Sequence, residues 1–217
     1  MRVLFSDDLI AVCVKPAGVQ SEAATLEQKS PRTSMPELLM QEDGGETYYP
    51  IHRLDTAAAG LMVYAKTPEA AAALSRAVTE GNFEKKYLAL VHGQPETETG
   101  EYFDLLFKDT KRSKSFVVTN MRKGVKEAYL SYETLKTGPT PYGEASLVLV
   151  TLKTGRTHQI RVQFSSRRMP LLGDGKYGAK DRCPFLALFS AYLSFPHPAT
   201  GQRMTFEAEP DFLDLLP

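Results

Sequence analysis

Residues 52–65 carry the stretch HRLDTAAAGLMVYA, a charged tetrapeptide followed by small residues and an apolar run. The apolar part, Leu61 to Ala65, predicts a strand, and the tetrapeptide before it predicts a loop in which Leu54 acts as an anchor. Loops on a rigid scaffold are where reactive groups tend to lie. By spacing alone, Asp55 is either a catalytic carboxylate pointing into a cleft or one partner of a surface ion pair with a neighbouring arginine.

The segments before this stretch carry signals for the start and end of a strand and of a helix. Ile10 to Val14 predicts a buried strand that ends at the turn Pro16-Ala17-Gly18, and residues 21–33 are polar and loop-like. Ser34 and Glu37 form a capping-box pattern that predicts a short helix through Met40, ended by Gly44-Gly45.

A second helix is expected to start at Thr67-Pro68-Glu69, continue over residues 70–78 and end at Gly81.

Strand patterns dominate the chain after this helix. Residues 95–100 and 138–143 are expected to be loops, because glycine, proline and polar residues dominate them. Strands are predicted over 83–91, 115–119, 128–135, 145–152, 186–195 and 203–208.

Many strands, few helices and no regular βαβ rhythm predict an α+β fold with a mixed, mainly antiparallel central sheet flanked by helices and loops. We expect a single domain over residues 1–217 with a cleft across its middle. A 42% share of hydrophobic residues and 24% of charged residues argues against disorder.

The charge distribution and the cysteines limit which partners and which cellular compartment are expected. The 26 basic and 26 acidic side chains cancel, so the distribution of charge matters more than the total. Basic residues crowd positions 108–126, so one face can be positive. Cys13 and Cys183 lie outside any metal or redox spacing, which suits a reducing compartment. No signal peptide or membrane-length apolar run is present, so we expect a cytoplasmic protein.

A second dense polar cluster lies at residues 155–161, Gly-Arg-Thr-His-Gln-Ile-Arg. Two arginines, a histidine and a glutamine so close together suit contacts to phosphates and base edges, or else form a charged hairpin or helix face. The alternation of Ile160, Val162 and Phe164 fits a strand. Ile160 and Phe164 also share a helical face, and Thr157 could cap a helix, so both alternatives stay open.

Several segments, taken in order, make the chain similar to the RluA-type family of RNA pseudouridine synthases. The resemblance covers nearly the whole chain. The residues that carry it are Leu4-Phe5 through Val14-Lys15-Pro16-Ala17-Gly18, His52-Arg53-Leu54-Asp55 with Gly60-Leu61 and Ala65-Lys66, Lys86 to Val91 with Gly93, Gly155 to Val162, Leu172-Gly173-Asp174 with Tyr177-Gly178, and Phe195-Pro196-His197-Pro198.

The chain departs from the family pattern in two places. A Thr-Ser pair usually precedes the glycine that follows the catalytic motif, and Ala58-Ala59 stand there instead. Those hydroxyl groups would support the loop, so their loss bears on loop rigidity and activity. Many relatives carry an N-terminal S4 RNA-binding domain, whereas here the catalytic opening begins at once. We therefore expect a stand-alone catalytic domain.

The resemblance implies an isomerase that turns uridine into pseudouridine, with Asp55, Tyr87 and Arg161 as catalytic residues. Arg161 would pair with Asp55 and keep that carboxylate ionised. Tyr87 would stack on the uracil and its hydroxyl could take part in proton transfer. By its position alone, Tyr87 is more simply explained as a half-buried strand aromatic.

The substrate-binding residues implied by the resemblance are His52, Arg53, Lys86, Arg156 and Ile160. Arg53 could fill the space of a flipped uridine, hold the backbone or simply contact a phosphate. Lys86 and Arg156 suit phosphate contacts. The basic stretch 108–126 is either a mobile arm that grips RNA or a solvated face.

We expect no cofactor and no metal, because the spacing of His52, His92, His158 and His197 matches no zinc or iron site. The expected partner is ribosomal or transfer RNA, with no membrane and no DNA, and a monomer is the default. Two alternatives are an RNA-binding or RNA-folding factor on the same fold that is catalytically impaired, and a metal-dependent nuclease or phosphoesterase.

Overall fold

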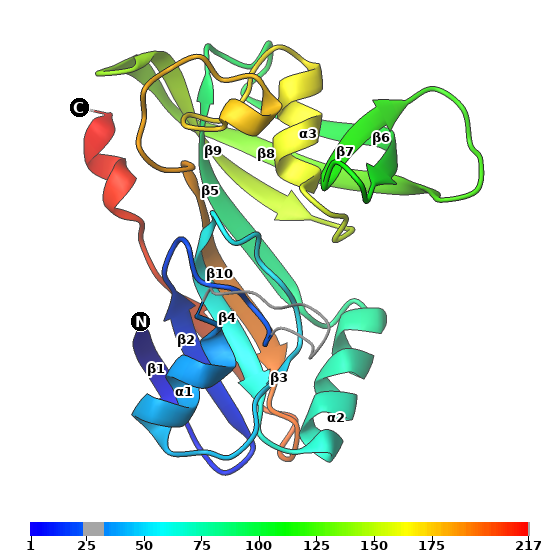
Figure 1. Ribbon diagram of the computed structural model, residues 1–217, viewed down its shortest axis with the longest axis vertical. Helices are drawn as coiled ribbons and strands as arrows, with labels where there is room; N and C mark the ends of the chain where they lie inside the picture. The colour runs from blue at the N-terminus through cyan, green and yellow to red at the C-terminus, as the bar shows by residue number, and fades with distance from the viewer. Residues whose placement is uncertain (24–32, 217) are drawn as a thin grey trace. The chain divides into compact units, whose positions relative to one another are not determined.

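The computed structural model describes residues 1–23 and 33–216, and the described chain divides into two compact units. Unit 1 comprises the described parts of Met1–Lys85 together with Phe189–Pro210. Unit 2 comprises Lys86–Leu188 and the segment that begins at Asp211 (Figure 1). Each unit has its own buried core, and the strands of both belong to one sheet.

The sheet of unit 1 places its strands in the order β1-β2-β4-β10, with β3 beside β4 and β11 beside β10. Neighbours are antiparallel except β4 and β10, which run parallel at Phe189–Ala59 and Ser190–Gly60. The strands are β1 (Arg2–Ser6), β2 (Ile10–Lys15), β3 (Tyr49–Pro50), β4 (Ala59–Ala65), β10 (Leu188–Pro196) and β11 (Arg203–Glu207).

The two helices of unit 1 begin where the sequence predicts. In α1 (Met35–Asp43) the Glu37 carboxylate accepts a hydrogen bond from the Ser34 amide at 2.8 Å, and the helix runs three residues beyond the predicted end. In α2 (Pro68–Thr79) the Thr67 hydroxyl accepts from the Ala70 amide at 3.2 Å. These caps satisfy amides that have no partner inside the helix.

The core of unit 1 is centred on the adjacent, antiparallel strands β2 and β4. Ile10 to Cys13 and Leu61 to Ala65 are completely buried, on both faces of the sheet. A strand covered on both faces reads as a continuous apolar run, which is why these two segments are so clear in the sequence.

Unit 2 contains an antiparallel sheet in the order β5-β9-β8-β6-β7. Helix α3 (Gln159–Ser166) packs on this sheet beside β6 and β7 (Figure 1). The remaining elements are β5 (Glu84–His92), β6 (Thr99–Asp109), β7 (Lys114–Val118), β8 (Val125–Thr140), β9 (Gly143–Leu152) and the short helices η1 (Gly175–Tyr177) and η2 (Asp211–Leu215).

Aromatic side chains join α3 to the sheet. The Tyr102 ring lies 4.9 Å from the Tyr132 ring and 5.1 Å from that of Phe164 between centroids, the latter edge-on. Such edge-to-face pairs add to the free energy gained from burial alone. Phe164 is completely buried, so α3 is fixed on the sheet by its apolar face.

Two predicted loops are wrong in part. Strand β6 begins at Thr99, inside the predicted loop 95–100, and was not predicted at all. The predicted loop 138–143 lies mostly within the β8–β9 hairpin, where Gly138 pairs with Ala145 and Thr140 with Gly143. Glycine and proline indicated a turn correctly, but the turn itself is only residues 141–142. In the predicted loop 21–33, residues 24–32 lie outside the described chain.

The open alternative for residues 155–161 is decided in favour of a helix. Helix α3 begins after His158, which takes the left-handed backbone conformation at φ 55° and whose side chain makes no capping hydrogen bond. The N-terminal boundary therefore lies at His158 and not at Thr157.

The α+β fold with a mixed, mainly antiparallel sheet and few helices is confirmed. The single domain over residues 1–217 stays a prediction. Within residues 1–23 and 33–216, no helix has both the length and the apolar character needed to cross a membrane.

The contact between β4 and β10 depends on a glycine. At Gly60, φ is 120°, and an added Cβ would lie 2.5 Å from the Ser190 carbonyl oxygen and closer still to its amide nitrogen. Both atoms belong to backbone, so neither can rotate away.

We therefore expect Gly60→Ala to lower the free energy of unfolding by more than about 3 kcal/mol, measured by urea denaturation. Gly81→Ala is the matched control, because Gly81 also has a positive φ, 77°, but open space around it. Backbone strain alone should cost that variant about 1 kcal/mol. Equal losses in the two variants would contradict the close-approach argument.

Candidate active site

In unit 1, Asp55 lies in the loop between β3 and β4, and this loop is fastened to the segment that follows β2. The Ser21 hydroxyl donates to the Leu54 carbonyl at 2.8 Å and accepts from the Leu54 amide at 3.0 Å. The Gly18 amide donates to the Thr56 carbonyl at 2.7 Å. Leu54 is buried, as its predicted anchoring role requires.

Beneath the loop lies Lys15, whose side chain is completely buried. Its ammonium group donates to the carbonyls of Pro16 at 3.0 Å, Val19 at 2.8 Å and Thr56 at 3.3 Å. Burial lowers the Lys15 pKa to about 8, and the negative charge of Asp55 acts in the opposite direction. The buried ammonium therefore serves two purposes, as a hydrogen-bonding post for the loop and as a positive charge near Asp55.

The backbone, not a side chain, closes the turn after Asp55. The Ala58 amide donates to the Asp55 carbonyl at 3.0 Å, and Ala58 itself is buried. Ala58-Ala59 replace the hydroxyl pair of the family pattern at this point. Lys15, Ser21 and the Ala58 amide together supply hydrogen bonds that hold the loop without those hydroxyls.

The two neighbours of Asp55 at the start of the motif lie in different environments. Arg53 is exposed and forms an ion pair with Glu22 at 2.8 Å, a surface pair that contributes little to stability. His52 is buried against Phe83, with ring centroids 5.5 Å apart. Among the described residues neither His52 ring nitrogen has a hydrogen-bond partner, and burial, with a smaller effect of the Lys85 charge, lowers the His52 pKa to about 3.

In unit 2, Arg161 lies on α3 and is held by a buried carboxylate. Its Nε donates to Asp174 Oδ2 and its Nη2 to Asp174 Oδ1, both at 2.7 Å, and the side chain of Asp174 is only 1% exposed. The Tyr177 ring lies 5.1 Å from the guanidinium carbon. A bidentate pair of this kind fixes the plane of the guanidinium as well as its position.

Tyr177 is itself held on two sides. Its hydroxyl accepts from the Ser115 amide at 2.8 Å and lies 2.9 Å from His158 Nδ1. The Lys114 ammonium lies 4.8 Å from the Tyr177 ring centroid. The basic β6–β7 hairpin and the arginine on α3 thus share one aromatic residue.

The other predicted residues of unit 2 surround α3 and β5. Tyr87 is buried in β5 opposite Val150, and Lys86 is half-buried next to it. Arg156 donates from Nε to the Glu127 carbonyl at 2.7 Å. Ile160 is buried, with 4% of its surface exposed.

The structure groups the predicted site residues within units. His52, Arg53 and Asp55 belong to unit 1, whereas Lys86, Tyr87, Arg156, Ile160 and Arg161 belong to unit 2. The expected proximity of Asp55 to Tyr87 and Arg161 joins residues of different units and stays a prediction, as do the roles of all eight residues.

Sequence reasoning missed four residues that position this site: Lys15, Ser21, Asp174 and Tyr177. A lysine at the end of an otherwise apolar strand is a signal that could have singled out Lys15. Asp174 and Tyr177 were read only as parts of the closing segment, because nothing in the linear sequence indicates that they contact Arg161.

Comparison with known proteins identifies the family. A family model described as RNA pseudouridylate synthase matches residues 9–166. The chain is 33% identical to the dual-specificity RNA pseudouridine synthase RluA of Escherichia coli K12, over 97% of this chain and 93% of that protein. It is 30% identical to tRNA pseudouridine synthase C of Haemophilus ducreyi, over 96% of this chain and 90% of that protein.

Two further comparisons agree with this family and with the fold. Ribosomal large subunit pseudouridine synthase D of Zymomonas mobilis is 32% identical over all of this chain and 71% of its own length. The structure of human RNA pseudouridylate synthase domain containing 1 superposes with a TM-score of 0.81 at 21% identity, over 97% of this chain and 84% of that one. The fold and the motifs thus define an RNA pseudouridine synthase, an isomerase. The chain belongs to the RluA-type family of these enzymes.

The Asp174 carboxylate is expected to matter for catalysis through Arg161. Asp174→Asn keeps the shape but removes the charge, so the guanidinium loses its fixed plane. We expect kcat for pseudouridine formation to fall about 10- to 100-fold with a smaller change in KM. Tritium release from RNA labelled at uridine C5 measures the rate.

Asp104→Asn is the matched control for that experiment, because Asp104 pairs with the arginine at the C-cap of α3, Arg167, at 2.9 Å. Both variants lose a carboxylate partner of the same helix, and melting temperatures report any loss of stability. If Asp174→Asn and Asp104→Asn had the same kcat below their melting temperatures, the positioning role of Asp174 would be wrong.

His52 gives the protein a defined sensitivity to acid. Its pKa is about 3 in the fold and 6.5 without burial, so the unfolded chain binds a proton between these values and the folded chain does not. Stability present above pH 6.5 is therefore lost as the pH falls. At pH 5 we expect wild type to have lost about 2 kcal/mol relative to His52→Phe, which cannot titrate. Urea denaturation at several pH values tests this, and parallel stability curves for the two proteins would refute it.

Proposed function

We propose that the protein converts specific uridines of a structured ribosomal or transfer RNA into pseudouridine, with Asp55 as the catalytic carboxylate. The observation that carries this proposal is the construction of the Asp55 loop. A buried lysine, a serine hydroxyl and two backbone amides hold the backbone of the loop that carries the half-buried Asp55, and the same lysine places a positive charge near its carboxylate. Surface ion pairs need no such support.

The proposed reaction breaks the bond between uracil N1 and ribose C1′ and joins C1′ to uracil C5. The C5 proton is lost and N1 gains one, so the product is an isomer and no cofactor is consumed. An ionised Asp55 either attacks the sugar or assists elimination of the base, and both routes need the carboxylate unprotonated. The Lys15 ammonium favours that ionised form.

Arg161 and Tyr87 are proposed to act on the same uridine. Arg161 has the fixed orientation that pairing with a carboxylate or a developing negative charge needs, because Asp174 holds its other edge. Tyr87 would provide a stacking surface for the uracil and a hydroxyl group for proton transfer. Together with Asp55 they make the two units parts of one catalytic domain in this proposal.

RNA contacts are assigned to the remaining predicted residues. Arg53, Lys86 and Arg156 are proposed to contact phosphates, and His52 and Ile160 to line the substrate site. The hairpin of β6 and β7, with the loop after it, adds the exposed cations Lys108, Lys111, Arg112, Arg122 and Lys123. We propose that this hairpin grips the RNA, since Lys114 and Ser115 connect it to Tyr177 and thus to Arg161.

The relatives support both classes of RNA, because one is named for transfer RNA, one for the large ribosomal subunit and one for dual specificity. Cys13 and Cys183 are free thiols, which agrees with the proposed cytoplasmic location. A monomer remains the proposed state.

An RNA-binding factor that has lost catalysis is the alternative that Ala58-Ala59 suggest. The hydrogen bonds of the Asp55 loop favour the enzyme, because they hold the loop without the missing hydroxyls. For a metal-dependent nuclease, no group of three histidine, cysteine, aspartate or glutamate side chains is placed to hold a metal in the described chain. Pseudouridine formation that survives excess EDTA would exclude a metal-dependent nuclease or phosphoesterase.

The first experiment is a pseudouridine map of total RNA from cells with and without this gene, using carbodiimide primer stops. We expect one or a few sites to vanish in its absence and to return with wild type but not with Asp55→Asn, which keeps the side-chain shape and lacks the charge. Melting temperatures of the purified proteins control for folding. A map that is unchanged without the gene would favour the binding factor, and Ala58→Thr with Ala59→Ser would then be the variant to test for gained activity.

A further inference from the structure

A cavity of about 750 Å³ lies in unit 2, and one of its lining residues, Tyr177, also contacts Arg161. It is lined by side chains from four places: His92 at the end of β5, Tyr142 in the β8–β9 turn, Arg168 just after α3, and Lys180 and Asp181 in the loop after η1. Its volume is within the range of small-molecule sites. His92 lies five residues beyond Tyr87 on the same strand, about 17 Å along it, so the His92 end of the cavity is distinct from the position proposed for the target uridine at Tyr87.

Two cations of this cavity have no partner within the described chain. No hydrogen bond or ion pair joins the side chain of Arg168 or Lys180 to another described residue, and both are exposed. The neighbouring Arg167, by contrast, is bound to Asp104. Arg168 and Lys180 are therefore available to an anion from outside the chain.

The backbone at Arg168 is unfavourable for an arginine. Its φ is 63°, the left-handed region in which glycine is normally found after a helix. The last carbonyls of α3 are satisfied by the backbone amides of Arg167, Arg168 and Met169, which a glycine at position 168 would provide equally well. The backbone conformation and the hydrogen bonds at the end of α3 therefore do not require the arginine side chain.

The acidic residue of the cavity does not oppose an anion strongly. The Asp181 side chain is only 2% exposed and accepts hydrogen bonds from the Gly173 amide at 3.1 Å and the Cys183 amide at 2.8 Å. Its second oxygen lies 2.6 Å from His92 Nε2. The Asp181 carboxylate therefore points into the loop, where hydrogen-bond donors partly offset its negative charge.

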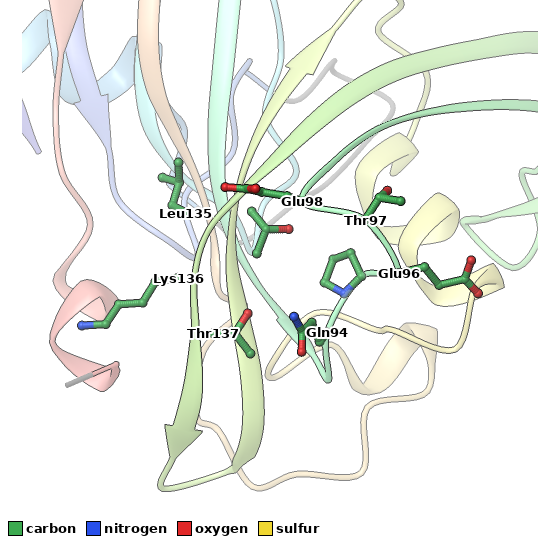
Figure 2. Close-up of a pocket in the computed structure, with 9 residues that line it drawn as sticks. Gln94, Glu96, Thr97, Glu98, Leu135, Lys136 and Thr137 are labelled. Carbon is green, nitrogen blue, oxygen red and sulfur yellow. The ribbon is translucent and has the colours of Figure 1, made fainter.

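A second, smaller cavity of unit 2 has the opposite character. It measures about 290 Å³ and is lined by residues 94–98 and 134–137. Figure 2 shows Lys136 extending away from Glu96 and Glu98, and its ammonium lies 3.4 Å from the Leu216 carbonyl. Two carboxylates among the lining residues, Glu96 and Glu98, disfavour a phosphate here, so the larger cavity suits one better.

We propose that the larger cavity holds one nucleotide of the RNA substrate, at a position outside the target uridine. Arg168 and Lys180 bind its phosphate, and the base lies against Tyr142 and His92. Aromatic rings stack on any base, and cations contact phosphates without reading sequence, so the site positions the RNA without selecting it. The proposal rests on RNA being the substrate, as proposed above.

The first test uses adenosine 5′-monophosphate as the probe, titrated into ¹⁵N-labelled full-length protein and followed by NMR. We expect the amides of Gly143, Gly178 and Lys180 to shift in wild type but not in Arg168→Gly with Lys180→Ala. Adenosine alone and inorganic phosphate alone should shift them at least 10-fold more weakly. Shifts with phosphate as strong as with the nucleotide would overturn the base contact, and no shift with the nucleotide would overturn the site.

The second test separates RNA binding from folding. Arg168→Gly should melt at or above the wild-type temperature, because glycine suits the left-handed backbone, yet raise KM for the RNA about 10-fold with kcat unchanged. Lys180→Ala should raise KM in the same way, while Arg182→Ala serves as the matched control, because Arg182 is exposed in the same loop but does not line the cavity.

The two proposals can fail separately. A wild-type protein that forms no pseudouridine defeats the proposed function, whatever the nucleotide titration gives. An active wild type, with Arg168→Gly and Lys180→Ala retaining the wild-type KM, defeats the nucleotide site alone.

Discussion

The buried ammonium group of Lys15 is the interaction on which the Asp55 loop depends. An uncompensated charge inside a protein is costly, and here three carbonyl oxygens and the nearby Asp55 offset that cost. The same contacts join the end of β2 to the Asp55 loop. Removing the lysine would leave carbonyls unpaired as well as a carboxylate without its nearby positive charge, so structure and chemistry are coupled at this one side chain.

Unit 2 follows the same principle with the signs exchanged. Arg161 is a buried cation, and Asp174 and Tyr177 fix its plane from two directions. In each unit a charged group proposed for catalysis has a second, deeply buried group of opposite charge near it: Asp174 binds Arg161 directly, and Lys15 holds the backbone of the Asp55 loop. Burying these charges lowers the stability of the fold. In return, the charged groups are already oriented and do not have to rearrange during the reaction.

The parts of the fold that sequence patterns predicted are those with local causes. Strands β2 and β4 are continuous apolar runs, and α1 and α2 begin at capping residues, so each is readable without knowledge of its neighbours. Strand β6 was missed because Asp104 occupies a position facing α3 between Tyr102 and Leu106, which interrupts the apolar alternation. Gln163 of α3 and Arg167 at its C-cap bind that carboxylate, and they are far away in sequence.

By itself the sequence determined the family, the reaction class and the candidate residues Asp55, Tyr87 and Arg161, since ordered motifs over most of the chain specify chemistry directly. Only the tertiary structure decided that residues 159–166 form a helix, that His52 is buried and neutral, and that Lys15, Ser21, Asp174 and Tyr177 support the site. The physical reason is that burial and hydrogen bonding depend on residues that are distant in sequence. An ionisable side chain has a different pKa inside the protein from the one it has in water, and the linear sequence does not indicate which side chains become buried.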